Sequence, residues 1–306
     1  MFGFIENLKY GKGIRVRIGS FLLYIGRNNF EEDYPYILKK WYKRRTGKTL
    51  NLENPKTFNE KMQWLKIYDS TPVKTKLADK YEVRQWVKEK IGEEYLIPLL
   101  GVWDSFDDIN FSSLPDKFVL KANHGSHWNI IVKDKSKLNI AKAKKSFDKW
   151  LKRDYSYKAG LELHYRGIRP KIIAEQFVSD SNNQLNDYKV LCFNGEPKFV
   201  WLDCGRYTKY RTKNIYDINW NLQPFAMSYK NSKQEIPAPE NLSKMVDLAR
   251  ILCKDFSFVR VDFYNLDGKI YFGEMTFTSM SGVEVFNPEE YDLILGNMLQ
   301  LPKKKS

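Results

Sequence analysis

One stretch decides the fold of this 306-residue chain: Val259-Arg260-Val261-Asp262-Phe263, followed by Asp267-Gly268 and then by Ile270-Tyr271-Phe272-Gly273-Glu274. Apolar and polar residues alternate on both sides of Asp267-Gly268, a pair that favours a tight two-residue turn. The pattern predicts an antiparallel β-hairpin. Because side chains alternate between the two faces of a strand, we expect Arg260, Asp262 and Glu274 to share strand faces.

The two acidic residues of this hairpin, Asp262 and Glu274, are expected to meet across the turn. Neighbouring carboxylates repel each other unless a cation lies between them, and oxygen ligands of this kind suit Mg²⁺. Arg260 beside them suits a planar anion such as a phosphoryl group. The alternative is a surface hairpin with charged outer positions, which the hairpin alone does not exclude.

Composition indicates a folded and strongly basic protein. Apolar residues make up 42% of the chain and aromatic residues 15%, which suits a substantial core in two or three lobes. The net charge of +14 favours an anionic partner such as nucleic acid, acidic lipid, a phosphate-bearing cofactor or a polyanionic glycan. The sequence contains no zinc finger, RNA-recognition signature or basic-region heptad, so we expect no nucleic-acid partner.

The sequence also predicts a cytoplasmic protein. No apolar run approaches the roughly 20 residues that cross a bilayer, and the short run at 21–25 lacks the cleavage site of a signal peptide. The three cysteines show no C-x-x-C spacing, which argues against a disulfide framework and a zinc site. The basic cluster Lys39–Arg45 fits either contact with the inner face of an anionic membrane or a solvated helix face.

Helices are expected in the first third of the chain. Thr57 and Glu60 have the spacing of a capping box, which begins a helix. Pro72 suits the first turn of one further helix, and Gly92 suits its end. Another amphipathic helix is expected over 137–153. Asn241 is expected to cap the start of a helix that precedes the hairpin at 259–274.

Strands are expected on both sides of the polar loop Asn123-His124-Gly125-Ser126-His127. A loop of small residues can close its backbone amides over phosphates, with Lys121 as a point charge at its base. The alternative is an ordinary hairpin, because the loop is not a Walker motif. Further strands are expected at 171–178, 187–193 and 197–202, and Asn194-Gly195 favours a type I′ turn between the last two.

The order of these features resembles the ATP-grasp superfamily of ligases, and more closely its TupA-like branch, whose namesake works in teichuronopeptide synthesis. Five phrases between Asn54 and Leu301 carry the resemblance in the same order: 54–61, 77–80, 121–125, 187–189 and 272–277. It implies an α+β ATP-grasp fold, in which two α+β lobes clasp ATP and a helical N-terminal region precedes them. The expected regions are 1–115 (helical), 116–178 (small lobe with the lid) and 179–306 (core lobe).

The resemblance also implies roles for individual residues. Lys121 and Lys189 would reach the ATP phosphates under a lid that includes Gly125 and Ser126, and Asp187 would bind the ribose. The implied adenine segment is Glu175, Gln176, Phe177 and Val178. The implied Mg²⁺ ligands are Asp262, Glu274 and Thr276, and the implied catalytic arginines are Arg260, Arg206 and Arg211. The superfamily usually has an asparagine where Thr276 stands, which puts a second metal ion in doubt.

The activity implied by the resemblance is ATP-dependent ligation of a carboxylate to an amine through an acyl phosphate. The implied substrates are a uronic acid of a cell-surface polysaccharide, of capsule, O-antigen or teichuronopeptide type and carried on a membrane lipid, and an amino acid or similar amine. One rival is a glycosyltransferase of the same kind of pathway, although no Asp-x-Asp triplet is present. The other is a non-catalytic basic binding protein, which leaves Glu175, Asp262 and Glu274 unexplained.

Overall fold

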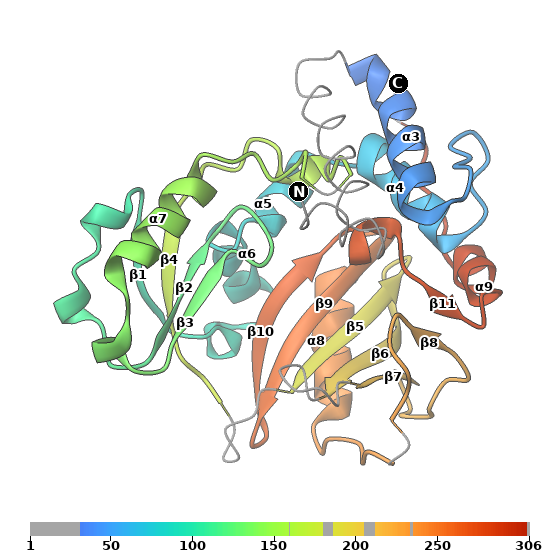
Figure 1. Ribbon diagram of the computed structural model, residues 1–306. Helices are drawn as coiled ribbons and strands as arrows, with labels where there is room; N and C mark the ends of the chain where they lie inside the picture. The colour runs from blue at the N-terminus through green and yellow to red at the C-terminus, as the bar shows by residue number, and fades with distance from the viewer. Residues whose placement is uncertain (1–30, 159, 180–185, 205–211, 233–234, 305–306) are drawn as a thin grey trace, which may run out of the picture. The chain divides into compact units, whose positions relative to one another are not determined.

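The computed structural model describes residues 31–158, 160–179, 186–204, 212–232 and 235–304 (Figure 1). Helices and strands are mixed, as the α+β class requires. The α-helices are α3 (Tyr34–Thr46), α4 (Phe58–Tyr68), α5 (Pro72–Ala78), α6 (Glu82–Ile91), α7 (Ile140–Leu151), α8 (Leu242–Cys253) and α9 (Tyr291–Met298). The strands are β1 (Leu99–Trp103), β2 (Phe118–Ala122), β3 (Asn129–Val132), β4 (Ile172–Gln176), β5 (Asp187–Phe193), β6 (Glu196–Cys204), β7 (Thr212–Asp217), β8 (Ala226–Met227), β9 (Phe258–Leu266), β10 (Lys269–Thr276) and β11 (Phe286–Asn287).

The chain divides into two compact units, each built from separate stretches of sequence. The first unit contains Met1–Pro72, Asp154–Arg166 and Thr278–Ser306, and the second contains Val73–Arg153 and Gly167–Phe277. These units do not test the division into 1–115, 116–178 and 179–306, which stays a prediction. The predicted Arg206 and Arg211 lie outside the described residues.

A four-stranded antiparallel sheet in the second unit has the order β1-β4-β2-β3. Burial alternates along β2, so Phe118 and Leu120 are fully buried while Val119 and Lys121 are half-buried on the other face. The buried face packs on α7, where Phe147 stacks on Phe106 with ring centroids 5.7 Å apart. This packing leaves the Lys121 face of the sheet for polar contacts.

A five-stranded antiparallel sheet in the same unit has the order β10-β9-β5-β6-β7 (Figure 1). One face is apolar and forms a core with α8, in which Val190, Val261 and Phe263 are almost fully buried. Lys189 and Asp262, which are adjacent in sequence to these apolar residues, therefore lie on the opposite face. The sheet thus carries a polar face although all its charged residues named here are buried.

Both predicted two-residue turns have the geometry expected of them. Asn194 and Gly195 have φ values of 52° and 79°, and Asp267 and Gly268 have values of 50° and 83°. Left-handed conformations at both central positions define the type I′ turn, which matches the twist of antiparallel strands. The hairpins β5–β6 and β9–β10 are confirmed.

One prediction about helix boundaries is wrong. The helix that begins at Pro72 ends at Ala78, because the Asp79 carboxylate accepts the backbone N–H of Tyr81 at 2.8 Å and starts α6. Asn241 is the N-cap residue of α8, as predicted, but its side chain makes no capping bond to that helix. It donates instead to the carbonyl of Gly268 at 2.8 Å and so braces the β9–β10 turn.

In the first unit, α4 carries a buried polar stripe that the sequence reading missed. The capping box at its start is confirmed. Asn59, Gln63 and Lys66 follow one another at helical spacing, and all three are buried. Gln63 donates to the carbonyls of Ser281 and Gly282, and Lys66 donates to that of Ser281 at 2.5 Å. The stripe therefore holds the segment that follows β10 in the sequence by satisfying its backbone.

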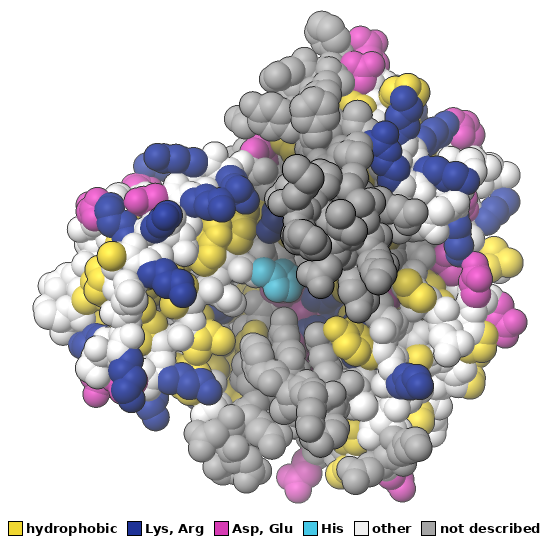
Figure 2. Space-filling view, in the orientation of Figure 1, with side chains coloured by type: hydrophobic (Ala, Val, Ile, Leu, Met, Phe, Trp, Pro, Cys, Tyr) yellow, Lys and Arg dark blue, Asp and Glu magenta, His cyan; other side chains and the backbone are white. Residues whose placement is uncertain are grey.

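The basic cluster at Lys39–Arg45 lies in α3. Its apolar residues Ile37, Leu38 and Trp41 are buried, while Lys40, Lys43 and Arg44 are exposed, as a solvated helix face requires. On the described surface shown in Figure 2, Lys and Arg side chains are spread widely rather than gathered in one patch. Among the described residues, no helix has the length and apolar character needed to cross a membrane. Contact of this cluster with a membrane stays a prediction.

Candidate active site

The β9–β10 hairpin brings the residues predicted as metal ligands together. Glu274 pairs directly with Asp262, and Thr276 pairs with Arg260. Paired residues of neighbouring strands lie on the same face of a sheet. The predicted meeting of Asp262 and Glu274 across the turn is therefore confirmed as geometry.

This pairing depends on a β-bulge that was not predicted. The register between β9 and β10 shifts by one residue between Phe272 and Glu274, so Gly273 is an extra residue in β10. In an unbroken alternation Glu274 would share the apolar face with Ile270 and Phe272. The bulge moves it to the polar face, opposite Asp262.

Gly273→Val should destabilise the protein by about 1–3 kcal/mol, the usual range for overpacking. A Cβ atom at this position would lie 3.0 Å from the backbone oxygen of Asp262, and a β-branched side chain also favours a regular strand over a bulge. Urea unfolding measures the effect. Gly273→Ala, which adds only the Cβ atom, should cost less than the valine. A valine variant as stable as the wild type would contradict the structural importance of the bulge.

A compact cluster of charges surrounds Asp262. Arg260 donates to both of its carboxylate oxygens, each at 2.6 Å, and also to Glu274 at 3.1 Å. Lys189, which is paired with Asp262 in the register, donates to it at 3.2 Å and to Asp187. Arg260, Lys189, Asp187 and Asp262 are all less than 9% exposed. Two carboxylates and two cations are thus buried together, and the half-buried Glu274 lies at their edge.

These charges shift the pKa values of the site. Burial opposes ionisation of Glu274, but the positive charges of Lys80 and Arg260 outweigh it and lower the Glu274 pKa to about 2. Burial raises the pKa of Asp262, and the charges of Arg260 and Lys189 act against that rise. Burial also disfavours the charged form of Arg260, but Asp262 reverses the effect and raises its pKa. Glu274 is consequently an anion at neutral pH.

The oxygen atoms of the site fit Mg²⁺ if substrate phosphates supply the remaining ligands. Asp262, Glu274 and Thr276 offer hard oxygen atoms, and the Oε2 atom of Glu274 accepts no hydrogen bond from any described residue. No group of three or more His, Cys, Asp or Glu side chains that could hold a metal ion occurs among the described residues. Mg²⁺ commonly binds through one or two carboxylates together with substrate phosphates. The residues therefore fit a Mg²⁺ ion that arrives with a nucleotide.

The polar face of the four-stranded sheet holds a second group of charges. Lys121 donates to Glu175 at 2.5 Å across neighbouring strands β2 and β4. Arg84 of α6 donates to the other oxygen of Glu175 at 2.9 Å and to the carbonyl of Ile97 at 2.8 Å. Two cations thus neutralise Glu175, and Lys121 is directed at this carboxylate. Arg84 was not predicted from the sequence.

Lys80 is a further residue of the site that sequence reasoning missed. Its ammonium donates to the carbonyl of Gly125 at 2.5 Å, and its backbone N–H donates to the carbonyl of Asn123 at 3.2 Å. Burial lowers the pKa of Lys80, while the charge of Glu274 acts in the opposite direction. Lys80 therefore contacts the loop predicted to bind phosphate, and the negative charge of Glu274, a predicted metal ligand, acts on its pKa. The available sequence signal was that Lys80 lies in 77–80, one of the five stretches that carry the family resemblance.

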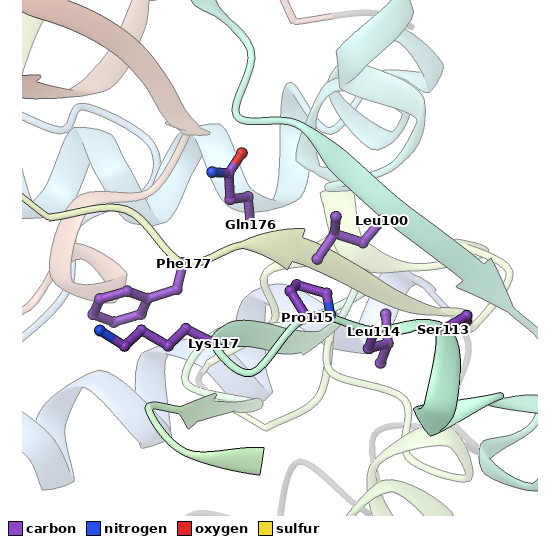
Figure 3. Close-up of a pocket in the computed structure, with 7 residues that line it drawn as sticks. All are labelled: Leu100, Ser113, Leu114, Pro115, Lys117, Gln176 and Phe177. Carbon is purple, nitrogen blue, oxygen red and sulfur yellow. The ribbon is translucent and has the colours of Figure 1, made fainter.

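Two residues of the predicted adenine segment line an open pocket of about 630 Å³. In Figure 3 the side chain of Phe177 extends in the same direction as that of Lys117, whereas Gln176 points away from them. The other lining residues are Leu100, Ser113, Leu114 and Pro115. Of the remaining predicted residues, Val178 and Ser126 are half-buried and Gly125 is buried. Their roles stay predictions.

Comparisons with known proteins identify a family for this chain. A family model described as TupA-like ATPgrasp matches residues 60–300. No curated protein matched the chain. Similar solved structures include a D-alanine–D-alanine ligase from Bacillus anthracis complexed with ATP (13% identity, TM-score 0.43, 72% of this chain and 64% of that chain) and an L-amino acid ligase from Bacillus licheniformis (12% identity, TM-score 0.47, 79% and 55%). The chain spans between about half and two thirds of these structures.

Proposed function

The chain belongs to the TupA-like ATP-grasp family, and we propose that it is an ATP-dependent ligase that joins a carboxylate to an amine through an acyl phosphate. The family match confirms the ATP-grasp fold predicted from the sequence. The observation that carries the proposal is that Asp262 and Glu274 meet across a hairpin beside the buried cations Arg260 and Lys189. Carboxylates beside cations are what Mg²⁺ and a transferred phosphoryl group require.

In this proposal the residues of the two sheets bind Mg²⁺ and the phosphates of ATP. Glu274 and Asp262 would hold Mg²⁺, with the Thr276 hydroxyl beside them, and the bound ion would neutralise phosphate oxygens. Arg260 and Lys189, which donate to Asp262 in the structure, would donate to the phosphoryl group as well. Lys121 and Lys80 would bind phosphates from the side of the 123–127 loop.

The reaction proceeds in two displacements. A carboxylate oxygen of the first substrate attacks the γ-phosphorus of ATP, the bond to the bridging oxygen breaks, and ADP leaves. Mg²⁺ held by Asp262 and Glu274 would neutralise charge on the leaving group. The nitrogen of the amine then attacks the acyl carbon, and inorganic phosphate leaves as the nitrogen loses a proton. The products are an amide, ADP and phosphate. The cations of the site stabilise the negative charge that develops on the oxygens in both steps.

For the substrates, we propose a uronic acid of a surface glycan and an amino acid or a similar amine. The net charge of +14 and the widespread basic side chains support an acidic glycan (Figure 2). A glycan carried on a membrane lipid would place the reaction at the inner face of the membrane. The glycosyltransferase interpretation gains no support from the family match, whereas the ligase does.

A thermal-shift titration tests the proposed function. MgATP should stabilise the wild type, since a ligand at 100 times its dissociation constant adds about 2.7 kcal/mol to the free energy of unfolding. Lys121→Ala should lose most of that shift. Lys133→Ala, which removes an exposed lysine beside β3, should keep it. A shift with UDP-sugars alone would favour a glycosyltransferase, and no shift with either ligand would contradict an ATP-dependent enzyme.

A further inference from the structure

Two buried residues on the polar face of the five-stranded sheet have no part in the proposed phosphoryl transfer. Trp201 of β6 pairs with Lys189, and Lys213 of β7 pairs with Asp203. Because paired residues share a face, Trp201 and Lys213 lie on the same face as Asp262. Each is only 2% exposed. Their position extends the polar face from the charge cluster towards β7.

The indole ring of Trp201 is flanked by two cations. The ammonium of Lys213 lies 3.8 Å from the ring centroid, and the guanidinium carbon of Arg260 lies 5.6 Å from it. Arg260 belongs to β9, which β5 separates from β6, and neighbouring strands lie about 4.8 Å apart. The contact between Trp201 and Arg260 therefore spans β5 and joins Trp201 to the residues that would bind the phosphoryl group. Contacts of this kind are cation–π interactions, which hold the cations in place.

The indole N–H of Trp201 is a buried donor for which no described residue supplies an acceptor. Buried tryptophan N–H groups usually find a partner, because leaving one unpaired costs the hydration it has lost. Its two neighbours at the ring, Lys213 and Arg260, have only donor groups on their side chains. An oxygen atom of a bound anion would therefore satisfy the N–H.

An aromatic ring completes the surroundings of Lys213. The ammonium lies 4.8 Å from the ring centroid of Tyr229, which is 40% exposed. The exposed part of this ring offers an apolar surface on which the C–H groups of a sugar ring can pack, and the Asp203 carboxylate lies on the same face of the sheet. A ligand with an apolar ring face, hydroxyl groups and a carboxylate would use all of these groups. A small amino acid would use only the cations.

We propose that Trp201, Lys213 and Tyr229 form the subsite that holds the carboxylate substrate as a sugar acid. In this subsite the Nε1–H of Trp201 donates a hydrogen bond to a substrate oxygen. The inference rests on the proposed ligase function, because the subsite is defined by its closeness to Arg260. It assigns substrate specificity to residues of β6, β7 and the segment after β8, outside the predicted ATP-binding residues.

The test observes the indole N–H directly by nitrogen-15 NMR, with D-glucuronate and D-galacturonate as probes in the presence of MgADP. Trp201→Phe keeps an aromatic ring between the cations but removes the N–H, and so identifies the Trp201 resonance by its loss. We expect a sugar acid to move this resonance downfield and to bind Trp201→Phe at least about 10-fold more weakly, with MgATP binding unchanged. Trp220 is the matched control, because its N–H already donates to the carbonyl of Ile236 at 2.8 Å and should not respond.

The outcomes separate this inference from the function on which it rests. If MgATP stabilises the protein but neither sugar acid moves the Trp201 resonance, the subsite is wrong and the ligase proposal stands. If L-alanine or L-glutamate moves the resonance and the sugar acids do not, the substrate class is wrong. If MgATP does not bind to the wild type, the proposed function itself fails. Tyr229→Leu gives a second variant, expected to weaken sugar-acid binding, should Trp201→Phe not fold.

Discussion

Glu274→Gln should remove the gain in ATP affinity that Mg²⁺ provides and lower turnover by about 10³-fold. The lowered pKa of Glu274, about 2, makes its side chain an anion at any pH of interest, and an amide would supply no charge to a hard cation. Loss of one preorganised group that stabilises transition-state charge typically costs 10²–10³-fold, and a metal ligand belongs at the upper end. The amide oxygen of glutamine can still accept the bonds from Arg260 and Thr276, so the fold should survive.

Calorimetric titration with ATP, with and without Mg²⁺, measures this effect without knowledge of the carboxylate substrate. Release of ADP in the presence of sugar acids and amines then reports turnover. Asp267→Asn provides a matched control in the same hairpin, because asparagine tolerates the left-handed conformation of that turn position. A Glu274→Gln protein that gains as much ATP affinity from Mg²⁺ as the wild type would contradict the metal assignment.

Local patterns predicted much of the fold because the responsible interactions are local. The pairs Asn194-Gly195 and Asp267-Gly268 specify type I′ turns through their own backbone preferences. The capping box at Thr57 likewise satisfies its donors within a single turn of helix. Alternation of apolar residues then indicated which face of each strand is buried. These signals do not depend on the rest of the chain.

Other features depend on residues far apart in the sequence and gave no local signal. The bulge at Gly273 reverses the face on which Glu274 lies, and only the packing of both faces specifies it. Strand β1 joins the four-stranded sheet by pairing with β4, about seventy residues later in the chain. The break after Ala78 depends on Asp79, whose carboxylate also accepts a bond from Asn123. A reading of periodicity alone continues the helix through this point.

The candidate site likewise contains residues that the sequence predicted and residues that it did not. Asp262, Glu274 and Arg260 were predicted together and lie together in one hairpin. Lys189, predicted separately as a phosphate-binding residue, is paired with Asp262 in the same sheet. Their roles, and those of the other predicted site residues, stay predictions. Lys80 was overlooked, since a lysine within the helix predicted from Pro72 to Gly92 resembles any solvated helix lysine, and its contact with the 123–127 loop depends on residues far away in the sequence. Its contacts suggest a test with a large expected effect.

Lys80→Met should weaken ATP binding by about 100-fold, which corresponds to about 2.8 kcal/mol. Lys80 supplies a positive charge next to the 123–127 loop, and burial has already removed much of its water, so the phosphates of ATP would replace hydration that is largely lost. Methionine has a similar length but no charge, and it leaves the carbonyl of Gly125 without this donor. The loss should therefore appear in ATP affinity more strongly than in stability.

Lys80→Arg and Lys76→Met separate a phosphate contact from a structural one. Lys76 is an exposed lysine one helical turn earlier, so its replacement should leave ATP binding unchanged. Arginine keeps a donor and a positive charge at position 80, and should recover part of the affinity that methionine loses. If Lys80→Met instead binds ATP as tightly as the wild type but unfolds at a lower urea concentration, Lys80 only braces the loop. The positive charge beside the phosphates would then rest with Lys121 alone on this side of the site, and the double charge that the structure places there would have no catalytic purpose.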